Sequence, residues 1–137
     1  MHEWALAESI INTAVETADK EKLKKITEIN IKLGELQQIE REIFNFALNE
    51  IIDSRKELLG NVKINIKTEK TAFRCRRCGH KWDFKVMKNS LDEYESEAIH
   101  FLPEVVLAHK RCPNCSSPDV EIVKGRGVYI ISIKGEN

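Results

Sequence analysis

The stretch FRCRRCGHKWDF, residues 73–84, contains the first of two cysteine pairs that decide how this chain folds. Two residues separate Cys75 from Cys78, and the same spacing recurs at Cys112 and Cys115 in KRCPNCSSPDV, residues 110–120. Two CxxC pairs are the usual sequence form of a four-thiolate zinc site, because this spacing lets both sulfurs of a pair reach one tetrahedral ion. The pairs therefore predict a zinc-binding domain.

Residues next to the cysteines support this interpretation. Gly79 permits a tight backbone turn under the metal, and Pro113 stiffens the second turn. Iron in a rubredoxin-like site is the main rival, since it also uses paired CxxC. A thioredoxin-like redox pair fits less well, because CRRC does not begin a helix in a βαβ pattern. We predict a structural zinc, since a closed four-cysteine site leaves no coordination position open for chemistry.

The segment between the two pairs is long, running from Gly79 to Arg111. Within it, residues 91–101 predict one short helix, which Pro103 then interrupts. The cysteine region from residue 73 to residue 118 has no strong periodicity, so we expect it to be an insertion between regular elements.

Regular periodicity appears on both sides of that region. Apolar residues recur at three- and four-residue spacing over 6–18 and again over 38–54, which predicts two amphipathic helices. Apolar and polar residues alternate in KITEINIKLG (25–34), GNVKINIKTE (60–69) and VYIISIKG (128–135), which predicts three strands. Gly125 and Gly127 suggest a turn before the last strand.

These elements predict an α+β fold. Two helices pack on a small three-stranded sheet, the last strand returns to the first two, and a four-cysteine, zinc-ribbon-like domain is inserted. The expected domains are residues 1–72 with 119–137, and residues 73–118. The core is modest at this size, so a structural metal would help to hold the insertion.

Composition limits the possible partners. Lys and Arg total 22 and Asp and Glu total 22, so the net charge is zero, whereas proteins that bind nucleic acid through phosphates usually carry a basic excess. No apolar run approaches the roughly 20 residues of a membrane span, and the N-terminus has no signal-peptide pattern. We expect a cytoplasmic protein that binds neither nucleic acid nor membrane, whose cysteines are not paired in structural disulfides.

The chain begins MHE, so His2 follows Met1 directly. The Met1 amine, the His2 backbone nitrogen and the His2 imidazole can enclose one metal ion in fused chelate rings. The amide nitrogen must lose its proton to join, and the resulting planar, nitrogen-rich geometry suits Cu(II) and Ni(II) better than Zn(II). One coordination position stays open, for which Glu3 and His100 are candidates. Chance matches to such a motif are common, so the residues alone leave this site a hypothesis.

The other histidines carry weaker signals. His80 follows Cys78 by two residues and His109 precedes Cys112 by three. Each is a candidate neighbour or substitute ligand for the zinc, and an exposed surface imidazole is an equally good interpretation.

Three features together resemble the HypA family of nickel metallochaperones: MHEWALAESI at the start, IKLGELQQIE (31–40), and the two CxxC pairs in the C-terminal half. The resemblance covers essentially the whole chain. It implies a nickel-binding domain that uses His2, with Glu3 beside it, and a zinc domain that uses the four cysteines. The long segment between the pairs departs from the shorter bacterial spacing and is similar to the archaeal form.

The resemblance also implies a role and partners. Family members deliver nickel during maturation of [NiFe] hydrogenase, work with a HypB-type nucleotidase (a GTPase or ATPase), and pass the ion to the hydrogenase large subunit. They are not enzymes. A delivery protein must hold nickel yet release it, which suits an incomplete set of ligands at a chain terminus.

Two other classes of function compete with this prediction. A zinc-ribbon module that binds nucleic acid or a polymerase is favoured by the basic residues of RCRRCGHK (74–81) and by Trp82, but the acidic run DEYESE (92–97) opposes it. A redox or hydrolytic enzyme ranks last, because the chain has no phosphate loop, HExxH or Ser/His/Asp motif.

Overall fold

The computed structural model describes residues 2–85, 94, 98, 102 and 111–137. The chain forms two compact units. The first, here called the helical unit, comprises Met1–Lys32, Ile39–Lys67 and Val128–Asn137. The second, here called the cysteine unit, comprises Leu33–Gln38 and Thr68–Gly127.

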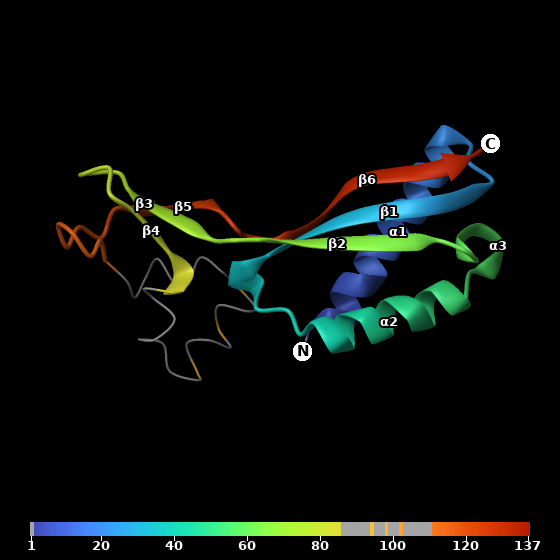
Figure 1. Ribbon diagram of the computed structural model, residues 1–137, viewed down its shortest axis with the longest axis horizontal. Coiled ribbons are helices and arrows are strands. Elements are labelled where there is room, and N and C mark those ends of the chain that lie inside the picture. Colours follow the sequence, from blue (N-terminus) through green and yellow to red (C-terminus); the bar gives the residue numbers. More distant parts are fainter. Residues whose placement is uncertain (1, 86–93, 95–97, 99–101, 103–110) are drawn as a thin grey trace. The chain divides into compact units, whose positions relative to one another are not determined.

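The helical unit consists of helices and one sheet (Figure 1). Its sheet has three strands in the order β2-β1-β6, so the last strand of the chain pairs with the first. The backbone N–H of Lys24 donates to the carbonyl of Glu136, and Gly34 donates to Gly127, so β6 runs antiparallel to β1. The bounds are α1 Glu3–Glu21, β1 Lys25–Gly34, α2 Arg41–Asp53, α3 Lys56–Leu59, β2 Lys63–Glu69 and β6 Val128–Glu136.

The core of this unit follows from the apolar spacing of the sequence. Residues three and four apart on α1 share one face, and the buried ones are Ala7, Ile10, Ile11, Ala14 and Ala18. Phe44, Ala47 and Leu48 of α2, which packs against α1, and Ile26, Ile29 and Ile31 of β1 are buried as well. The small residues of α1 let the two helices approach closely. This burial of apolar surface is the main force that holds the unit together.

The cysteine unit has a sheet of its own. Its strands are β3 Ala72–Cys75, β4 Lys81–Asp83 and β5 Val120–Lys124, in the antiparallel order β4-β3-β5. No strand was assigned to residues 73–118 from the sequence, because this region has no strong periodicity, yet β3 and β4 lie largely within it. Strands this short show little alternation, so sheet pairing rather than periodicity identifies them. The core combines Leu36, Phe73, Cys75, Trp82, Phe84, Cys112 and Val120.

The units divide the chain differently from the expected domains 1–72 with 119–137, and 73–118. Residues 33–38 lie in the cysteine unit, because Leu36 of η1 (Glu35–Gln37) is buried in its core and donates its N–H to the carbonyl of Gly125 at 3.0 Å. The Glu35 carboxylate also accepts the backbone N–H of Thr71 at 3.0 Å. A side chain at Gly34 would overlap the backbone of Gly125, so only glycine lets these segments meet.

The predicted fold class is confirmed: two main helices with a three-stranded sheet, and a separate four-cysteine unit. The helices differ in extent from the predicted 6–18 and 38–54, and the short α3 was not predicted. The expected helix over 91–101 and the break at Pro103 lie mostly outside the described residues. Among the helices that the structure describes, none combines the length and apolar character needed to cross a membrane.

Candidate metal centre

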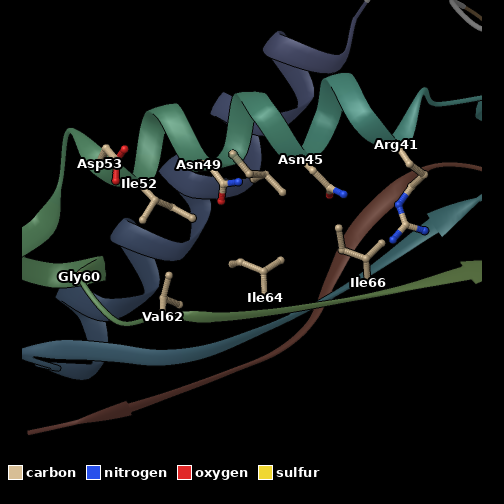
Figure 2. Close-up of a pocket in the computed structure, with 10 residues that line it drawn as sticks. Arg41, Asn45, Asn49, Ile52, Asp53, Gly60, Val62, Ile64 and Ile66 are labelled. Carbon is tan, nitrogen blue, oxygen red and sulfur yellow. The ribbon is translucent and has the colours of Figure 1, made fainter.

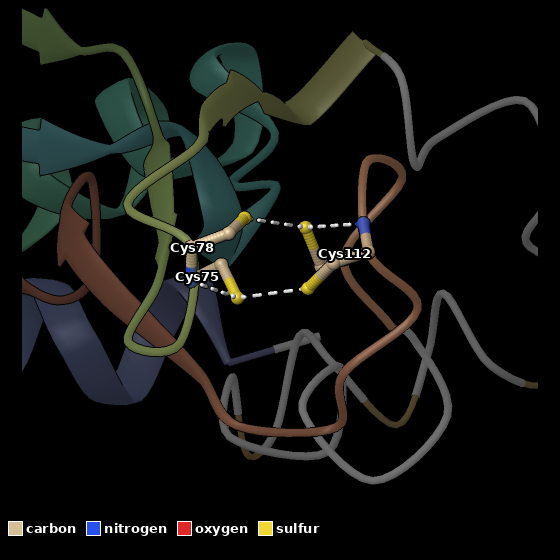
Figure 3. Close-up of side chains that lie close together, drawn as sticks. Cys75, Cys78 and Cys112 are labelled. Carbon is tan, nitrogen blue, oxygen red and sulfur yellow. Dashed lines mark hydrogen bonds between the residues drawn. The ribbon is translucent and has the colours of Figure 1, made fainter.

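The four predicted cysteine ligands come together in the cysteine unit (Figure 3). Their sulfur atoms all lie within 4.8 Å of one another. The Sγ atoms of Cys75 and Cys115 are 3.6 Å apart, as are those of Cys78 and Cys112. These separations are far longer than the roughly 2 Å of a disulfide. They agree with a tetrahedral ion bound at about 2.3 Å from each sulfur, which places sulfurs about 3.8 Å apart.

The two CxxC pairs sit in turns with the same hydrogen-bond pattern. In the first, the N–H of Gly79 donates to the carbonyl of Cys75, and the N–H of Cys75 donates to the carbonyl of His80, both at 2.9 Å. In the second, Ser116 donates to Cys112 at 2.9 Å and Cys112 donates to Ser117 at 3.0 Å. Each pair therefore presents two sulfurs from one closed backbone turn.

The residue that follows each pair has a left-handed backbone conformation. Gly79 has φ of 78° and Ser116 has φ of 62°. Gly79 was predicted to permit this turn, and the structure confirms it. Ser116 was missed, although its place directly after the second CxxC, equivalent to that of Gly79, was a usable signal.

Backbone amides donate to the sulfurs, as they do around metal-bound thiolates. The N–H of Cys78 lies 3.4 Å from the Cys75 sulfur, and the N–H groups of Asn114 and Cys115 lie 3.3 and 3.4 Å from the Cys112 sulfur. The side-chain amide of Asn114 also lies 3.6 Å from the Cys78 sulfur. Asn114 was not predicted to take part in the site, and nothing in its position within CPNC indicates this contact in advance.

The thiols differ in acidity. The backbone N–H of His80 and the Asn114 amide lower the pKa of the Cys78 thiol to about 6. Cys115 accepts from the backbone at Ser117, yet burial and the neighbouring sulfurs of Cys75, Cys78 and Cys112 raise the pKa of its thiol to about 12. Four adjacent thiolates repel one another, so a bound cation is needed to keep all four deprotonated. The donor set therefore fits zinc.

His80 does not join this cluster. Its exposed ring stacks on Trp82, with centroids 5.7 Å apart and an interplanar angle of 17°. Among the described residues, the four cysteines form the one group of three or more potential metal ligands within reach of a single ion. His100 and His109 lie outside the described residues, so their roles stay predictions.

The N-terminal residues begin the helical unit. His2 is the N-cap residue of α1, and its carbonyl accepts the N–H of Leu6 at 2.8 Å. Glu3 is only 2% exposed, and its carboxylate accepts the backbone N–H of Glu40, the N-cap residue of α2, at 3.3 Å. Met1 lies outside the described residues. The structure thus places His2 and Glu3 where the first turn of α1 meets the start of α2.

The ionisation of Glu3 reflects this position. Burial raises the pKa of its carboxyl, but hydrogen bonds, including those from the backbone N–H groups of Glu3 itself and Glu40, outweigh burial and hold the pKa below its usual value. Glu3 is therefore an anion at neutral pH and complements the positive ends of two helices. The sequence suggested Glu3 as a ligand but did not reveal its contact with Glu40.

Comparison with known proteins finds a match that covers nearly the whole chain. The family model that matches residues 1–135 is described as "Hydrogenase/urease nickel incorporation, metallochaperone, hypA". The chain belongs to the HypA family. The HypA family consists of metallochaperones, so this chain is a metal-delivery protein of hydrogenase maturation and not an enzyme.

Archaeal HypA proteins are among the similar relatives, in agreement with the long segment between the cysteine pairs. The hydrogenase maturation factor HypA of Pyrococcus abyssi is 50% identical over 136 residues, covering 99% of this chain and 96% of that protein. The HypA of Thermococcus onnurineus is 48% identical over 137 residues, with coverage of 99% and 96%.

A solved structure supports the fold. The solution structure of the nickel metallochaperone HypA from Helicobacter pylori aligns with a TM-score of 0.63 at 20% identity, covering 99% of this chain and 98% of that one. At this identity the likeness concerns the fold alone. The fold is therefore shared by distant sequences.

Proposed function

We propose that this HypA protein binds Ni(II) through its N-terminus and delivers it during maturation of [NiFe] hydrogenase. The Met1 amine, the His2 backbone nitrogen and the His2 imidazole are the proposed nickel ligands, with Glu3 and His100 as candidates for the remaining position. On this proposal the helical unit carries the nickel, and the cysteine unit carries a structural zinc on Cys75, Cys78, Cys112 and Cys115.

One observation supports the proposed nickel site. His2 is the N-cap residue of α1, and its neighbour Glu3 is buried and bonded to the start of α2. An α-helix does not use the N–H of its N-cap residue in its own i→i−4 pattern. Nickel can therefore replace the proton on the His2 amide without breaking a helical hydrogen bond. The fixed Glu3 meanwhile holds the chain so that the terminus leaves the helix at a defined place.

The electrostatics of this place favour reversible binding. Helix N-termini carry partial positive charge, which opposes a divalent cation. The Glu3 carboxylate offsets part of that charge, and loss of the amide proton adds a second negative group. Affinity then depends on pH, because binding releases protons. A site balanced in this way holds nickel and still gives it up to a competing set of ligands, as delivery requires.

The proposed zinc has a structural role. A closed set of four thiolates has no open position, so the ion would join the two turns that begin at Cys75 and Cys112 and stabilise the small core around them. These turns belong to one unit although 36 residues lie between Cys75 and Cys112. We propose no chemistry at this ion.

The partners follow from the family role. We propose a HypB-type nucleotidase, either a GTPase or an ATPase, as the protein that works with this chain, and the large subunit of [NiFe] hydrogenase as the acceptor of nickel. The proposed location is the cytoplasm. These assignments rest on membership of a family of hydrogenase maturation factors.

The ion pairs of the basic residues argue against the competing nucleic-acid function. The Arg76 guanidinium pairs with Asp119 at 3.0 Å and with Glu121 at 3.1 Å, and Arg74 also pairs with Glu121. Two of the arginines that suggested a phosphate-binding surface are thus neutralised by carboxylates within their own unit. This arrangement favours a surface stabilised by ion pairs over one that binds a polyanion.

The decisive test compares two forms of the zinc-loaded protein by calorimetric titration with Ni(II). One form has its native terminus and the other has one additional residue before Met1. We expect one nickel to bind the native form and none to bind the extended form, because the extension removes the terminal amine from the chelate. Equal binding by both forms would contradict the proposed site and would direct attention to His80, His100 and His109.

A further inference from the structure

The strand β2 lies at the edge of its sheet, and its two faces differ in chemistry. It ends the order β2-β1-β6, so among the described strands β1 is its one neighbour. Successive side chains of a strand point to opposite faces of the sheet. Ile64 and Ile66 point towards α2, so Lys63 and Lys67 point to the opposite face (Figure 2). A strand added at this edge would meet an apolar face on one side and a basic face on the other.

The apolar face of β2 borders a groove between this strand and α2, with a volume of about 670 Å³. Apolar residues line both of its walls: Leu48 and Ile52 on α2, and Val62, Ile64 and Ile66 on the strand side. All of these except Leu48 are only partly buried, so apolar surface in the groove is still in contact with water. Polar side chains of α2 complete the lining: Arg41, Asn45, Asn49 and Asp53.

The opposite face of β2 carries two cations without an ion pair. Lys63 and Lys67 are exposed, and neither lies within ion-pair distance of a carboxylate among the described residues. Glu28 of β1 lies on this face, but its carboxylate pairs with Lys134 at 3.3 Å and accepts from the Asn30 amide at 3.0 Å. The two β2 lysines can therefore pair with carboxylates of another molecule.

Hydrogen bonds across the sheet fix the position of these lysines. Asn65, midway between them, donates to the side chain of Asn30 at 2.9 Å, and Asn30 donates to Ser132 of β6 at 2.8 Å. Lys63 and Lys67 lie two residues to either side of Asn65, so their Cα atoms are about 13 Å apart along the strand. Residues four apart in any extended chain have the same separation. A matching partner strand therefore carries its carboxylates four residues apart.

Charge distinguishes the possible occupants of this edge. A second copy of this chain that paired through β2 would bring its own lysines onto the same face, and like charges on paired strands destabilise a sheet. Nucleic acid bound on a sheet stacks its bases on several aromatic side chains. The aromatic residue described on this face is Tyr129, and the Lys32 ammonium already lies 5.8 Å from its ring centroid. An acidic polypeptide strand fits better than either.

We propose that the β2 edge binds an extended segment of a different protein in which acidic residues alternate with apolar ones. The segment adds a fourth strand to the sheet β2-β1-β6. Its apolar side chains enter the groove beside α2, and two carboxylates four residues apart pair with Lys63 and Lys67. In such added strands the backbone hydrogen bonds supply affinity and the alternating side chains supply specificity.

Short peptides test this on the full chain, loaded with zinc and free of nickel, so that the result does not depend on the nickel site. The peptide VEVTVEV, acetylated and amidated, has its glutamates four apart and the same pattern in both directions. VVEETVV has the same composition without the alternation, and TETTTET keeps the charges without the apolar side chains. By fluorescence anisotropy we expect VEVTVEV to bind, and both controls to bind about tenfold more weakly or worse.

Charge reversal on the protein makes the test specific. The double variant K63E/K67E should bind VEVTVEV about tenfold more weakly or worse, because two attractions become two repulsions, and it should gain affinity for VKVTVKV. The matched control is K20E/K24E, which reverses two exposed lysines outside β2 with the same change in net charge. It should bind VEVTVEV as the wild type does. Circular dichroism and zinc content would show that each variant is folded.

Hydrogen exchange reports on the backbone pairing. Binding of VEVTVEV should slow the exchange of amides in β2, because an added strand accepts hydrogen bonds from them. Equal binding of the three acidic peptides, or binding without protection of β2, would overturn the proposal. So would a wild-type protein that binds none of them. In that case sedimentation would show whether a second copy occupies the edge, and titration with single-stranded DNA would show whether the lysines bind nucleic acid instead.

Discussion

The carboxylate of Glu3 and the backbone N–H of Glu40 form a hydrogen bond of 3.3 Å that joins the first turn of α1 to the N-cap of α2. The two residues are 37 positions apart in the sequence. Because Glu3 is almost fully buried, its charge is directed at the helix ends rather than at water. This contact connects the stability of the helical unit to the position of His2.

Replacing Glu3 by alanine removes this contact. We expect Glu3→Ala to lower the free energy of unfolding by about 1–2 kcal/mol, because the backbone N–H of Glu40 loses its acceptor and the start of α2 loses its capping carboxylate. Nickel affinity should fall as well, because His2 is then less firmly held. Urea denaturation and nickel titration measure the two effects. Glu3→Gln, which keeps an acceptor oxygen, should be milder in stability, and equal losses in both variants would show that the charge alone matters.

Replacing His2 by alanine separates nickel binding from folding. His2→Ala should abolish nickel binding, since the imidazole of the chelate is gone, while the α1 helix and the zinc content remain. Calorimetry reports the nickel, and metal analysis with circular dichroism reports the rest. Unchanged nickel affinity in this variant would show that His2 is not a nickel ligand.

Replacing Cys75 by serine affects the other unit. Cys75→Ser should reduce zinc content and destabilise the cysteine unit, because Cys75 is buried in its core.

The turn after the second cysteine pair tests the backbone argument. Ser116 has φ of 62°, a conformation in which β-branched residues are strained. Ser116→Val should destabilise the protein by roughly 1–2 kcal/mol, and Ser116→Gly should be neutral or stabilising. Thermal unfolding of zinc-loaded samples measures both. An unaffected Ser116→Val protein would mean that this turn is not constrained as described.

Zinc binding should strengthen as pH rises. In the metal-free protein the pKa of Cys78 is lowered to about 6 and that of Cys115 is raised to about 12, so near pH 7 the first is a thiolate and the second retains its proton. Zinc must displace that proton. Between about pH 6 and pH 12 the metal-free form therefore binds more protons than the zinc form, and affinity increases by up to about tenfold per pH unit for each proton released.

Calorimetry in buffers with different ionisation enthalpies counts the protons that zinc displaces. The side-chain amide of Asn114 contributes to the low pKa of Cys78, so Asn114→Ala should raise the number of protons released near pH 7. A zinc affinity that is constant over this range would contradict four-thiolate binding.

The sequence alone determined those features of this protein that depend on interactions between residues close together in the chain. Sulfur positions in a CxxC turn depend on a few neighbouring residues, so the set of four cysteines and the turn at Gly79 could be predicted. Helices and strands such as α1 and β1 also follow from the spacing of their apolar residues, because burial on one face requires that spacing. The family resemblance in MHE and in the cysteine pairs had the same local character.

Only the tertiary structure decided which distant segments meet. Leu36 belongs to the cysteine unit because the backbone at Gly34 and Leu36 pairs with that at Gly127 and Gly125, and no periodicity in residues 33–38 records this. The contact of Glu3 with Glu40 likewise depends on the path of the chain. Such contacts join residues far apart in sequence, and their energies depend on distances that exist only once the core has formed.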